Sequence, residues 1–243
     1  MVFATEFSPL IEDFDNNENL TMSSILKYFE NAGSRHSDAA GDSAIKVSET
    51  QGVAWVLTDW KVQVKVFPRY GQKIKVETWS EGLTSTFGTS RDFYLYADGE
   101  LLVEGTSRWI RLDLRAGRPI KVTQDLLDRY GPEPEKTVFG GEKLSRIALP
   151  ENFSFQTKIA LRKSDFDFNK HVHNLNYYDF ALEAIPESAA AFKNARISYK
   201  TALKQGDGAV AKYALVQNEG LGAKHIAAIY SDDGALACAV ELW

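Results

Sequence analysis

Hydrophobic and polar positions along the first half of the chain predict one helix followed by several strands. Residues 20–32 place four apolar side chains on one helical face: Met22, Ile25, Leu26 and Phe29. Alternation with a period of two then predicts strands within 61–66, 73–78, 91–97, 101–107 and 110–114. Asp98-Gly99 separates two of these runs and predicts a tight hairpin, because this pair tolerates positive φ angles.

A second helix is predicted at 175–185, where apolar residues recur at helical spacing. Asn174 is its expected N-cap and Pro186 its expected end. Three polar residues, Asp167, Asn169 and His171, occupy alternate positions on the turn that leads into it. Backbone N–H groups at a helix N-terminus favour negative charge, so this turn is a candidate site for stabilising an oxyanion.

The second half of the sequence repeats the first. Each member of the triplet Asp15, Asn17 and Asn19 lies 152 residues before its counterpart in Asp167, Asn169 and His171. Two later features are each repeated after 135 residues: Gly71 with Gly206, and Asp98-Gly99 with Asp233-Gly234. Blocks that keep their order and spacing indicate an internal repeat.

The repeat predicts an α+β fold made of two helix-wrapped antiparallel halves that form one continuous sheet. We expect the halves at 1–115 and 153–243. Residues 116–152 hold four of the seven prolines and are expected to connect the halves, with a short helix around 123–130.

Composition narrows the functional classes. The net charge of −5 argues against broad nucleic-acid binding, which requires a basic surface. No apolar run approaches the roughly 18 residues needed to span a bilayer, and the first residues lack the features of a secretory signal, so a cytoplasmic protein is expected. The single cysteine, Cys238, excludes an internal disulfide. His171-Val172-His173 offers two imidazoles, but the remaining histidines, His36 and His225, lack ligand spacing with a carboxylate cluster, so no metal is expected.

The run Asp167-Phe168-Asn169-Lys170-His171-Val172-His173-Asn174 resembles a motif of the acyl-ACP thioesterases, a family of tandem hotdog proteins. Supporting matches are Trp79, Arg91-Asp92-Phe93, Ser107-Arg108-Trp109, Ile197-Ser198-Tyr199 and Gly206-Asp207. The resemblance extends from about residue 5 to the last residue. It implies a double hotdog with an acyl-binding first half and a catalytic second half. It also implies hydrolysis of fatty acyl-acyl carrier protein to free fatty acid, without metal or organic cofactor, and catalytic roles for Asp167, Asn169 and His171.

The chain departs from the family at Ala202, where members resembling it usually carry a glutamate. In plant relatives a cysteine follows that glutamate, and here Leu203 stands in its place. A cysteine–histidine mechanism is therefore not available at this position, and Cys238 falls in the predicted last strand.

The chemistry of the triplet leaves several roles open. His171 can take a proton from water near neutral pH. Asp167 can orient His171, activate water or attack directly, and the amide of Asn169 can position water or polarise the carbonyl. The alternative is that Asp and Asn only form an Asx-type turn that caps a helix. Because Asn19 replaces the base in the first half, one active site per chain is expected.

Two further residue sets have a structural and a functional interpretation. Trp55, Trp60, Trp79 and Trp109 are predicted sheet core, and some of them are candidates to line an acyl channel. A basic set forms either a solvated face or a rim that steers the acidic carrier: Arg162, Lys163, Lys170, Lys193, Arg196, Lys200 and Lys204.

The competing functions are an acyl-CoA thioesterase of the same fold and a weakly active or non-catalytic acyl-ACP binding protein, the latter motivated by Ala202. Either a monomer or a homodimer fits the sequence.

Overall fold

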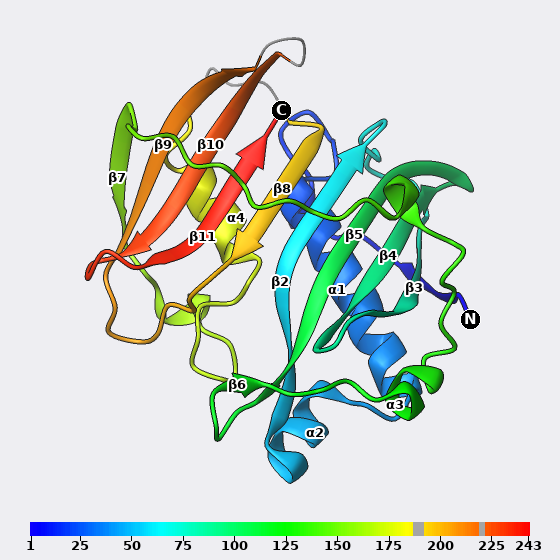
Figure 1. Cartoon of the computed structure of the whole chain (residues 1–243). Coiled ribbons are helices and arrows are strands. Elements are labelled where there is room, and N and C mark those ends of the chain that lie inside the picture. The colour runs from blue at the N-terminus through cyan, green and yellow to red at the C-terminus, as the bar shows by residue number, and fades with distance from the viewer. Residues whose placement is uncertain (187–191, 219–221) are drawn as a thin grey trace. The chain divides into compact units, whose positions relative to one another are not determined.

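The computed structural model describes residues 1–186, 192–218 and 222–243, and it divides the chain into two compact units (Figure 1). The first unit comprises Met1–Thr58 and Val62–Lys143, and the second comprises Asp59–Lys61 and Leu144–Trp243.

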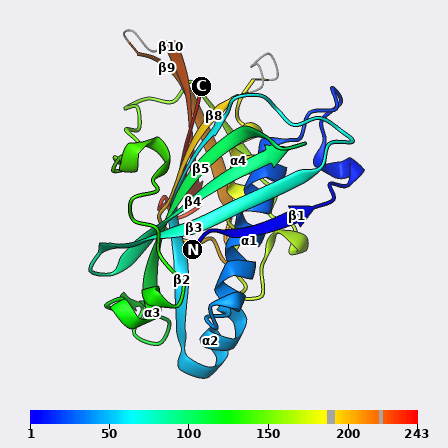
Figure 2. The ribbon, with the colours of Figure 1, turned by 90° about the vertical axis from the view of Figure 1, so that its right-hand side faces the viewer.

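The first unit is an antiparallel sheet packed on one long helix. Within it the strands follow the order β1-β3-β4-β5-β2. They are β1 Phe3–Phe7, β2 Val53–Val64, β3 Ile74–Ser85, β4 Gly88–Ala97 and β5 Glu100–Asp113, with β6 Arg118–Pro119 paired to the end of β5. Helix α1, Met22–Ala39, lies on one face of this sheet against β1 and β3 (Figure 2). The remaining elements are η1 Ile11–Asp13, α2 Ala44–Gln51, α3 Gln124–Asp128 and η2 Val138–Gly141.

Helix α1 is fixed at its start by a cap and along its length by apolar packing. The Thr21 hydroxyl accepts a hydrogen bond from the Ser24 N–H at 3.2 Å. Phe29 is fully buried and stacks on Phe93 of β4, with ring centroids 4.8 Å apart. A Cβ at Gly105 would lie 2.5 Å from the Phe29 ring, so this close approach of β5 to the helix requires glycine.

The second unit repeats this arrangement with a shorter helix. Its strands follow the order β7-β9-β10-β11-β8, which matches that of the first unit strand for strand. They are β7 Phe155–Ile159, β8 Asn194–Tyr199, β9 Ala209–Asn218, β10 Gly222–Ser231 and β11 Leu236–Leu242. Helix α4, Asn176–Leu182, packs on β9, β10 and β11, and η3 Lys163–Asp165 precedes it. The predicted internal repeat is therefore confirmed.

The two Asp-Gly pairs occupy equivalent turns. Asp98 and Gly99 have φ angles of 49° and 87° and join β4 to β5, as the hairpin prediction required. Asp233-Gly234 lies between β10 and β11, and Gly234 also has a φ of 87°. The left-handed backbone explains why glycine recurs at this position in both halves.

Residues 116–143, which the sequence assigns to the connection, fold against the first unit. Helix α3 confirms the short helix predicted around 123–130. Its residues Leu126 and Leu127 join Val122 and Tyr130 in a buried cluster that packs against Trp55. Further along, the Trp79 indole N–H donates to the Lys136 carbonyl at 2.5 Å. This segment therefore closes one end of the first unit's core.

Candidate active site

The predicted catalytic residues lie on a tight turn held by a carboxylate. Oδ1 of Asp167 accepts hydrogen bonds from the N–H groups of Asn169 at 2.8 Å and His171 at 3.1 Å. The Asp167 N–H donates to the His171 carbonyl at 2.8 Å, and Lys170 takes a φ of 61° to close the turn. The structure thus brings the three residues together through the backbone, with Asp167 and His171 partly buried and Asn169 exposed.

The first unit contains the same turn. Oδ1 of Asp15 accepts from the N–H groups of Asn17 at 2.8 Å and Asn19 at 2.9 Å, and Glu18 has a φ of 62°. The Asx-type turn is therefore a structural feature of both halves, whatever chemistry is attached to it. What distinguishes the second turn is an imidazole at position 171 where the first has the amide of Asn19.

Each turn is hydrogen-bonded to the segment that follows strand β2 in the first unit or strand β8 in the second unit. The Val172 N–H donates to the Leu203 carbonyl at 2.8 Å, as Leu20 donates to Pro68 at 2.7 Å. The Leu203 N–H in turn donates to the Tyr177 hydroxyl at 2.9 Å, and burial raises the pKa of Tyr177 to about 12. His171 is consequently held from both sides: by the Asp167 carboxylate and by the strand-like pairing of its neighbour.

The expected oxyanion donors at the helix N-terminus are not available. Helix α4 begins at Asn176, with Leu175 rather than Asn174 at its N-cap. The N–H groups of Asn176, Tyr177 and Tyr178 already donate to the carbonyls three residues before them, at 3.0, 3.4 and 3.2 Å. The expectation that these groups complete an oxyanion site is wrong, because the chain enters the helix through a series of tight turns that consume them.

Ala202, at the family's glutamate position, is exposed and lines a surface hollow together with Asp207 and Asp232. Cys238 is buried in β11, where burial raises the pKa of its thiol. It therefore stays protonated and is no nucleophile at neutral pH.

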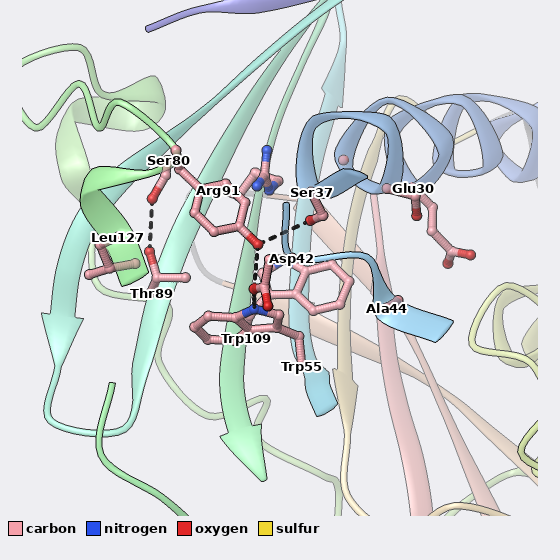
Figure 3. Close-up of a pocket in the computed structure, with 13 residues that line it drawn as sticks. Glu30, Ser37, Asp42, Ala44, Trp55, Ser80, Thr89, Arg91, Trp109 and Leu127 are labelled. Carbon is pink, nitrogen blue, oxygen red and sulfur yellow. Dashed lines mark hydrogen bonds between the residues drawn. The ribbon is translucent and has the colours of Figure 1, made fainter. Parts of the chain in front are cut away.

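The first unit holds a pocket that the sequence analysis did not identify (Figure 3). Its volume is about 80 Å³, and apolar walls come from Trp55, Trp109 and Leu127. Two of the four tryptophans considered above therefore line a pocket. Among its polar lining residues, the Tyr130 hydroxyl donates to Oδ2 of Asp42 at 2.7 Å, and the Ser37 hydroxyl lies 3.3 Å from the same Tyr130 hydroxyl.

The negative charge of Asp42 in this pocket is compensated by neighbouring side chains. Burial alone would raise the pKa of Asp42. Hydrogen bonds from Tyr130 and Trp55, and the Arg111 guanidinium 3.2 Å away, bring that pKa below its ordinary value instead. Asp42 is therefore a carboxylate at neutral pH, and its charge is fully compensated.

A second polar contact lies beside it, between Arg91 and His36. Nη1 of Arg91 donates to Nδ1 of His36 at 2.8 Å, and both side chains are buried. Burial, and then the Arg91 charge, lowers the pKa of His36 to about 4, so the imidazole is neutral and able to accept. The sequence signal for this group was the charged pair Arg91-Asp92 at the start of the predicted strand 91–97, whose other residues are apolar or aromatic.

Other residues singled out by sequence have structural roles or exposed positions. Arg196 is buried and donates to the Ser145 carbonyl at 2.7 Å, so it does not belong to a basic rim. Within the described part of the chain, no three His, Cys, Asp or Glu side chains gather as a metal site. No helix among residues 1–186, 192–218 and 222–243 has the length and apolar character that crossing a bilayer requires.

Comparison with known sequences gives matches along most of the chain. The model of the acyl-ACP thioesterase N-terminal domain matches residues 1–130, and that of the C-terminal domain matches residues 150–242. An oleoyl-acyl carrier protein thioesterase of Arabidopsis thaliana is 29% identical over 189 residues, covering 71% of this chain and 51% of the relative. One of Coriandrum sativum is 27% identical over 188 residues, covering 70% and 50%. The chain spans about half the length of these curated relatives.

Solved structures extend the likeness to the whole chain. A 12:0-ACP thioesterase from Umbellularia californica superposes with a TM-score of 0.84 at 18% identity, covering 99% of this chain and 96% of that one. An acyl-ACP thioesterase from Bacteroides thetaiotaomicron gives 0.84 at 19% identity, with the same coverage of 99% and 96%. The fold expected from the sequence resemblance is thereby confirmed.

Proposed function

Because the chain belongs to the acyl-ACP thioesterase family, we propose that it hydrolyses the thioester between a fatty acyl chain and the phosphopantetheine arm of acyl carrier protein. The products are a free fatty acid and the carrier's thiol, which ends fatty acid synthesis on that carrier. The observation that carries the proposal is the match to both domains of the family, with the Asp167–His171 turn inside the second. Both plant relatives named above are described as acyl carrier protein thioesterases, which favours that carrier.

His171 is the proposed general base. The imidazole takes a proton from water as the water oxygen attacks the thioester carbonyl, and a tetrahedral oxyanion forms. When that intermediate collapses the C–S bond breaks, and the imidazolium returns its proton to the leaving sulfur. The amide of Asn169, which is exposed on the same turn, is the proposed donor that positions the water or the carbonyl.

Asp167 is best assigned as the residue that orients His171. Its Oδ1 already accepts two backbone N–H groups, which makes that oxygen a weak nucleophile. In the first unit the second oxygen of Asp15 accepts from the side-chain amide of Asn19 at 3.3 Å. His171 is the counterpart of Asn19, so the proposed catalytic arrangement turns an imidazole N–H toward the equivalent oxygen of Asp167. Such a contact would fix the tautomer with the other nitrogen ready to accept a proton.

The first unit is the proposed binding unit for the hydrocarbon chain. Its pocket presents the indoles of Trp55 and Trp109 and the side chain of Leu127, which are apolar surfaces suited to methylene groups. The hydrogen-bonded side chains of Tyr130 and Asp42 also line this pocket. A saturated chain offers no hydrogen-bond partner to these groups, so we expect it to contact the apolar side chains instead.

The test is turnover of the His171→Ala variant on acyl-acyl carrier proteins of graded chain length, followed by release of free thiol. Loss of the general base should lower kcat by roughly 10²–10⁴-fold. The thermal unfolding midpoint should stay close to that of the wild type, because His171 is only partly buried. The matched control is Asn19→Ala, which changes the equivalent position of the first turn and should leave kcat within about twofold.

Activity of His171→Ala within a few-fold of the wild type would place the base elsewhere. The same panel separates the competing functions. An acyl-CoA thioesterase would turn over acyl-CoA faster than the matching acyl-acyl carrier protein, and a binding protein would retain acyl carrier without releasing thiol.

A further inference from the structure

A tyrosine hydroxyl connects helix α4 to the segment that supports the His171 turn. The Leu203 N–H donates to the Tyr177 hydroxyl at 2.9 Å, and the Leu203 carbonyl accepts from the Val172 N–H at 2.8 Å. Tyr177 and Leu203 are both buried, with 2% and 1% of their surfaces exposed. The hydroxyl therefore reaches the neighbour of His171 through a single intervening residue, Leu203.

The first unit forms the same support without a hydroxyl. There the Leu20 N–H donates to the Pro68 carbonyl at 2.7 Å. Pro68 has no N–H, and the residue that corresponds to Tyr177 by the repeat spacing is Ile25, which is fully buried. The first half thus pairs a proline with an isoleucine, whereas the second half pairs a residue that has an N–H with a tyrosine that accepts it.

A second tyrosine hydroxyl shows the same difference between the halves. The Tyr199 hydroxyl donates to the Asn174 carbonyl at 3.0 Å, and the rings of Tyr199 and Tyr177 pack edge to face with centroids 5.7 Å apart. At the counterpart of Tyr199 the first unit has Val64, which is buried. Helix α4 has seven residues where α1 has 18, so hydrogen bonds from its tyrosines supplement a much shorter apolar face.

Loss of the bond to Tyr177 would affect the turn. Leu203 is buried, so its N–H would have no water to replace the phenol oxygen, and a buried N–H without an acceptor is unfavourable. The segment around Leu203 would then shift until water reaches that N–H. Because the Leu203 carbonyl holds the Val172 N–H, and Lys204 forms a backbone bridge with His171, the same shift displaces the proposed base.

We propose that Tyr177 is a positioning residue for the proposed base: its hydroxyl fixes Leu203, and Leu203 fixes the turn that carries His171. Tyr177 acts through the backbone and does not touch the substrate, since its side chain is buried. Placement of the base matters because proton transfer requires hydrogen-bond distance to the reacting water. This inference rests on the proposed function for the role of His171, but the contact itself can be tested without substrate.

The experiment is Tyr177→Phe, which removes the hydroxyl and keeps the ring. The matched control is Tyr178→Phe on the same helix. Tyr178 is also buried, and its hydroxyl forms no hydrogen bond with a residue in 1–186, 192–218 or 222–243. Two properties are measured for each variant: the amide hydrogen exchange of Val172 by NMR, and kcat and KM on one acyl-acyl carrier protein.

We expect the Val172 amide of Tyr177→Phe to exchange about tenfold faster or more, because one buried hydrogen bond of its support is lost. The value of kcat should fall by about tenfold while KM changes by less than about twofold, since a displaced base acts on the transition state. Tyr178→Phe should change neither property.

A compensating variant tests the mechanism of the effect. Adding Leu203→Pro to Tyr177→Phe removes the N–H that lacks an acceptor, as Pro68 does in the first unit. Slow exchange at Val172 should return, and kcat should recover to within about threefold of the wild type. If the proline variant does not fold, the two phenylalanine variants decide on their own.

Unchanged exchange at Val172 in Tyr177→Phe would overturn the proposal, and so would faster exchange with an unchanged kcat. Recovery of slow exchange without recovery of kcat in the double variant would also overturn it, because the phenol would then act on the chemistry directly. Equal kcat losses in Tyr177→Phe and Tyr178→Phe would assign the effect to helix packing instead. Absence of hydrolysis in the wild type would defeat the proposed function alone, and the exchange rates would still decide whether Tyr177 holds the turn.

Discussion

Asp207 makes the same contact in the second unit that Gln72 makes in the first. Its carboxylate accepts the Lys204 N–H at 2.7 Å, and the Gln72 amide oxygen accepts the Arg69 N–H at 2.7 Å. A role shared with the half that lacks the proposed base is a turn role. Asp207 is therefore a poor substitute for the glutamate that the family resemblance implies at the position of Ala202, and the proposed catalytic network has one carboxylate fewer than that resemblance implies.

Restoring that carboxylate with Ala202→Glu should raise kcat more than it changes KM, because an acid–base contact acts mainly on the transition state. The side chain is exposed beside a hollow, so a longer residue has room. Ala202→Gln is the control, since it adds the same bulk without charge. Turnover of Ala202→Glu on one good acyl-acyl carrier protein that is unchanged or lower would contradict the expectation, and would indicate repulsion from Asp207 and Asp232 in the same hollow.

At the scale of elements, each half of the chain contains the same turn, which Asp15 stabilises in the first unit and Asp167 in the second. Replacing Asp15 with alanine removes the acceptor for two backbone N–H groups and should destabilise the chain by about 1–2 kcal/mol in urea unfolding. Its kcat should not change. Asp167→Ala should cost a similar free energy of unfolding and should also lower kcat, because the same carboxylate is proposed to orient His171.

Asparagine separates these two effects. Asp167→Asn keeps an acceptor for the turn, so the free energy of unfolding should stay near that of the wild type while kcat still falls. Equal stability and kcat losses for Asp15→Ala and Asp167→Ala would mean that the second carboxylate has no role beyond the turn.

Local patterns explain which elements the sequence revealed. The hairpin at Asp98-Gly99 and the strand alternation were predictable because turn chemistry and side-chain period act over a few residues. Strand β1 was missed because it is short and its pairing is distant, with Phe3 opposite Thr78. Helix α1 continues past the predicted end at 32 to Ala39 through Gly33, where packing against Arg91 compensates for weak helix formers.

The features of the candidate site also differ in how far a short sequence pattern encodes them. The turn with His171 is encoded in eight consecutive residues, so its existence was visible. The first unit's pocket is assembled from α1, α2, α3 and several strands, and no short pattern encodes it. The consumption of the helix N–H groups depends on where α4 begins, and an element boundary is a property of tertiary packing as much as of sequence.

For the molecule as a whole, two buried ionisable groups set opposing trends of stability with pH. Burial lowers the pKa of His36 to about 4 from an ordinary value of 6.5. Burial, and the neighbouring Glu81 carboxyl, raise the pKa of Asp92 to about 7 from 3.8, against the hydrogen bonds from Thr106 and Val138. Asp92 is fully buried, and one of its oxygens accepts the Val138 N–H at 2.7 Å.

The sign of each contribution follows from which state holds the proton more tightly. Folded His36 binds its proton more weakly than the unfolded chain, so its contribution is present above pH 6.5 and is lost as the pH falls towards 4. Folded Asp92 binds its proton more tightly, so its contribution is present below pH 3.8 and is lost as the pH rises through 7. Between about pH 4 and 6.5 the two slopes oppose each other and largely cancel.

Asp92→Asn should remove one of these slopes and leave the other. Asparagine keeps an oxygen for the Val138 N–H but cannot ionise. Thermal unfolding midpoints of the variant should therefore rise with pH between about 4 and 6.5, where the wild type is flatter, and should exceed those of the wild type above pH 7. Glu151→Gln, at an exposed carboxyl of the second unit, is the control and should leave the pH profile unchanged. Parallel profiles for Asp92→Asn and the wild type would contradict this expectation. They would mean that Asp92 is already ionised in the folded chain, and that its negative charge is compensated despite its burial.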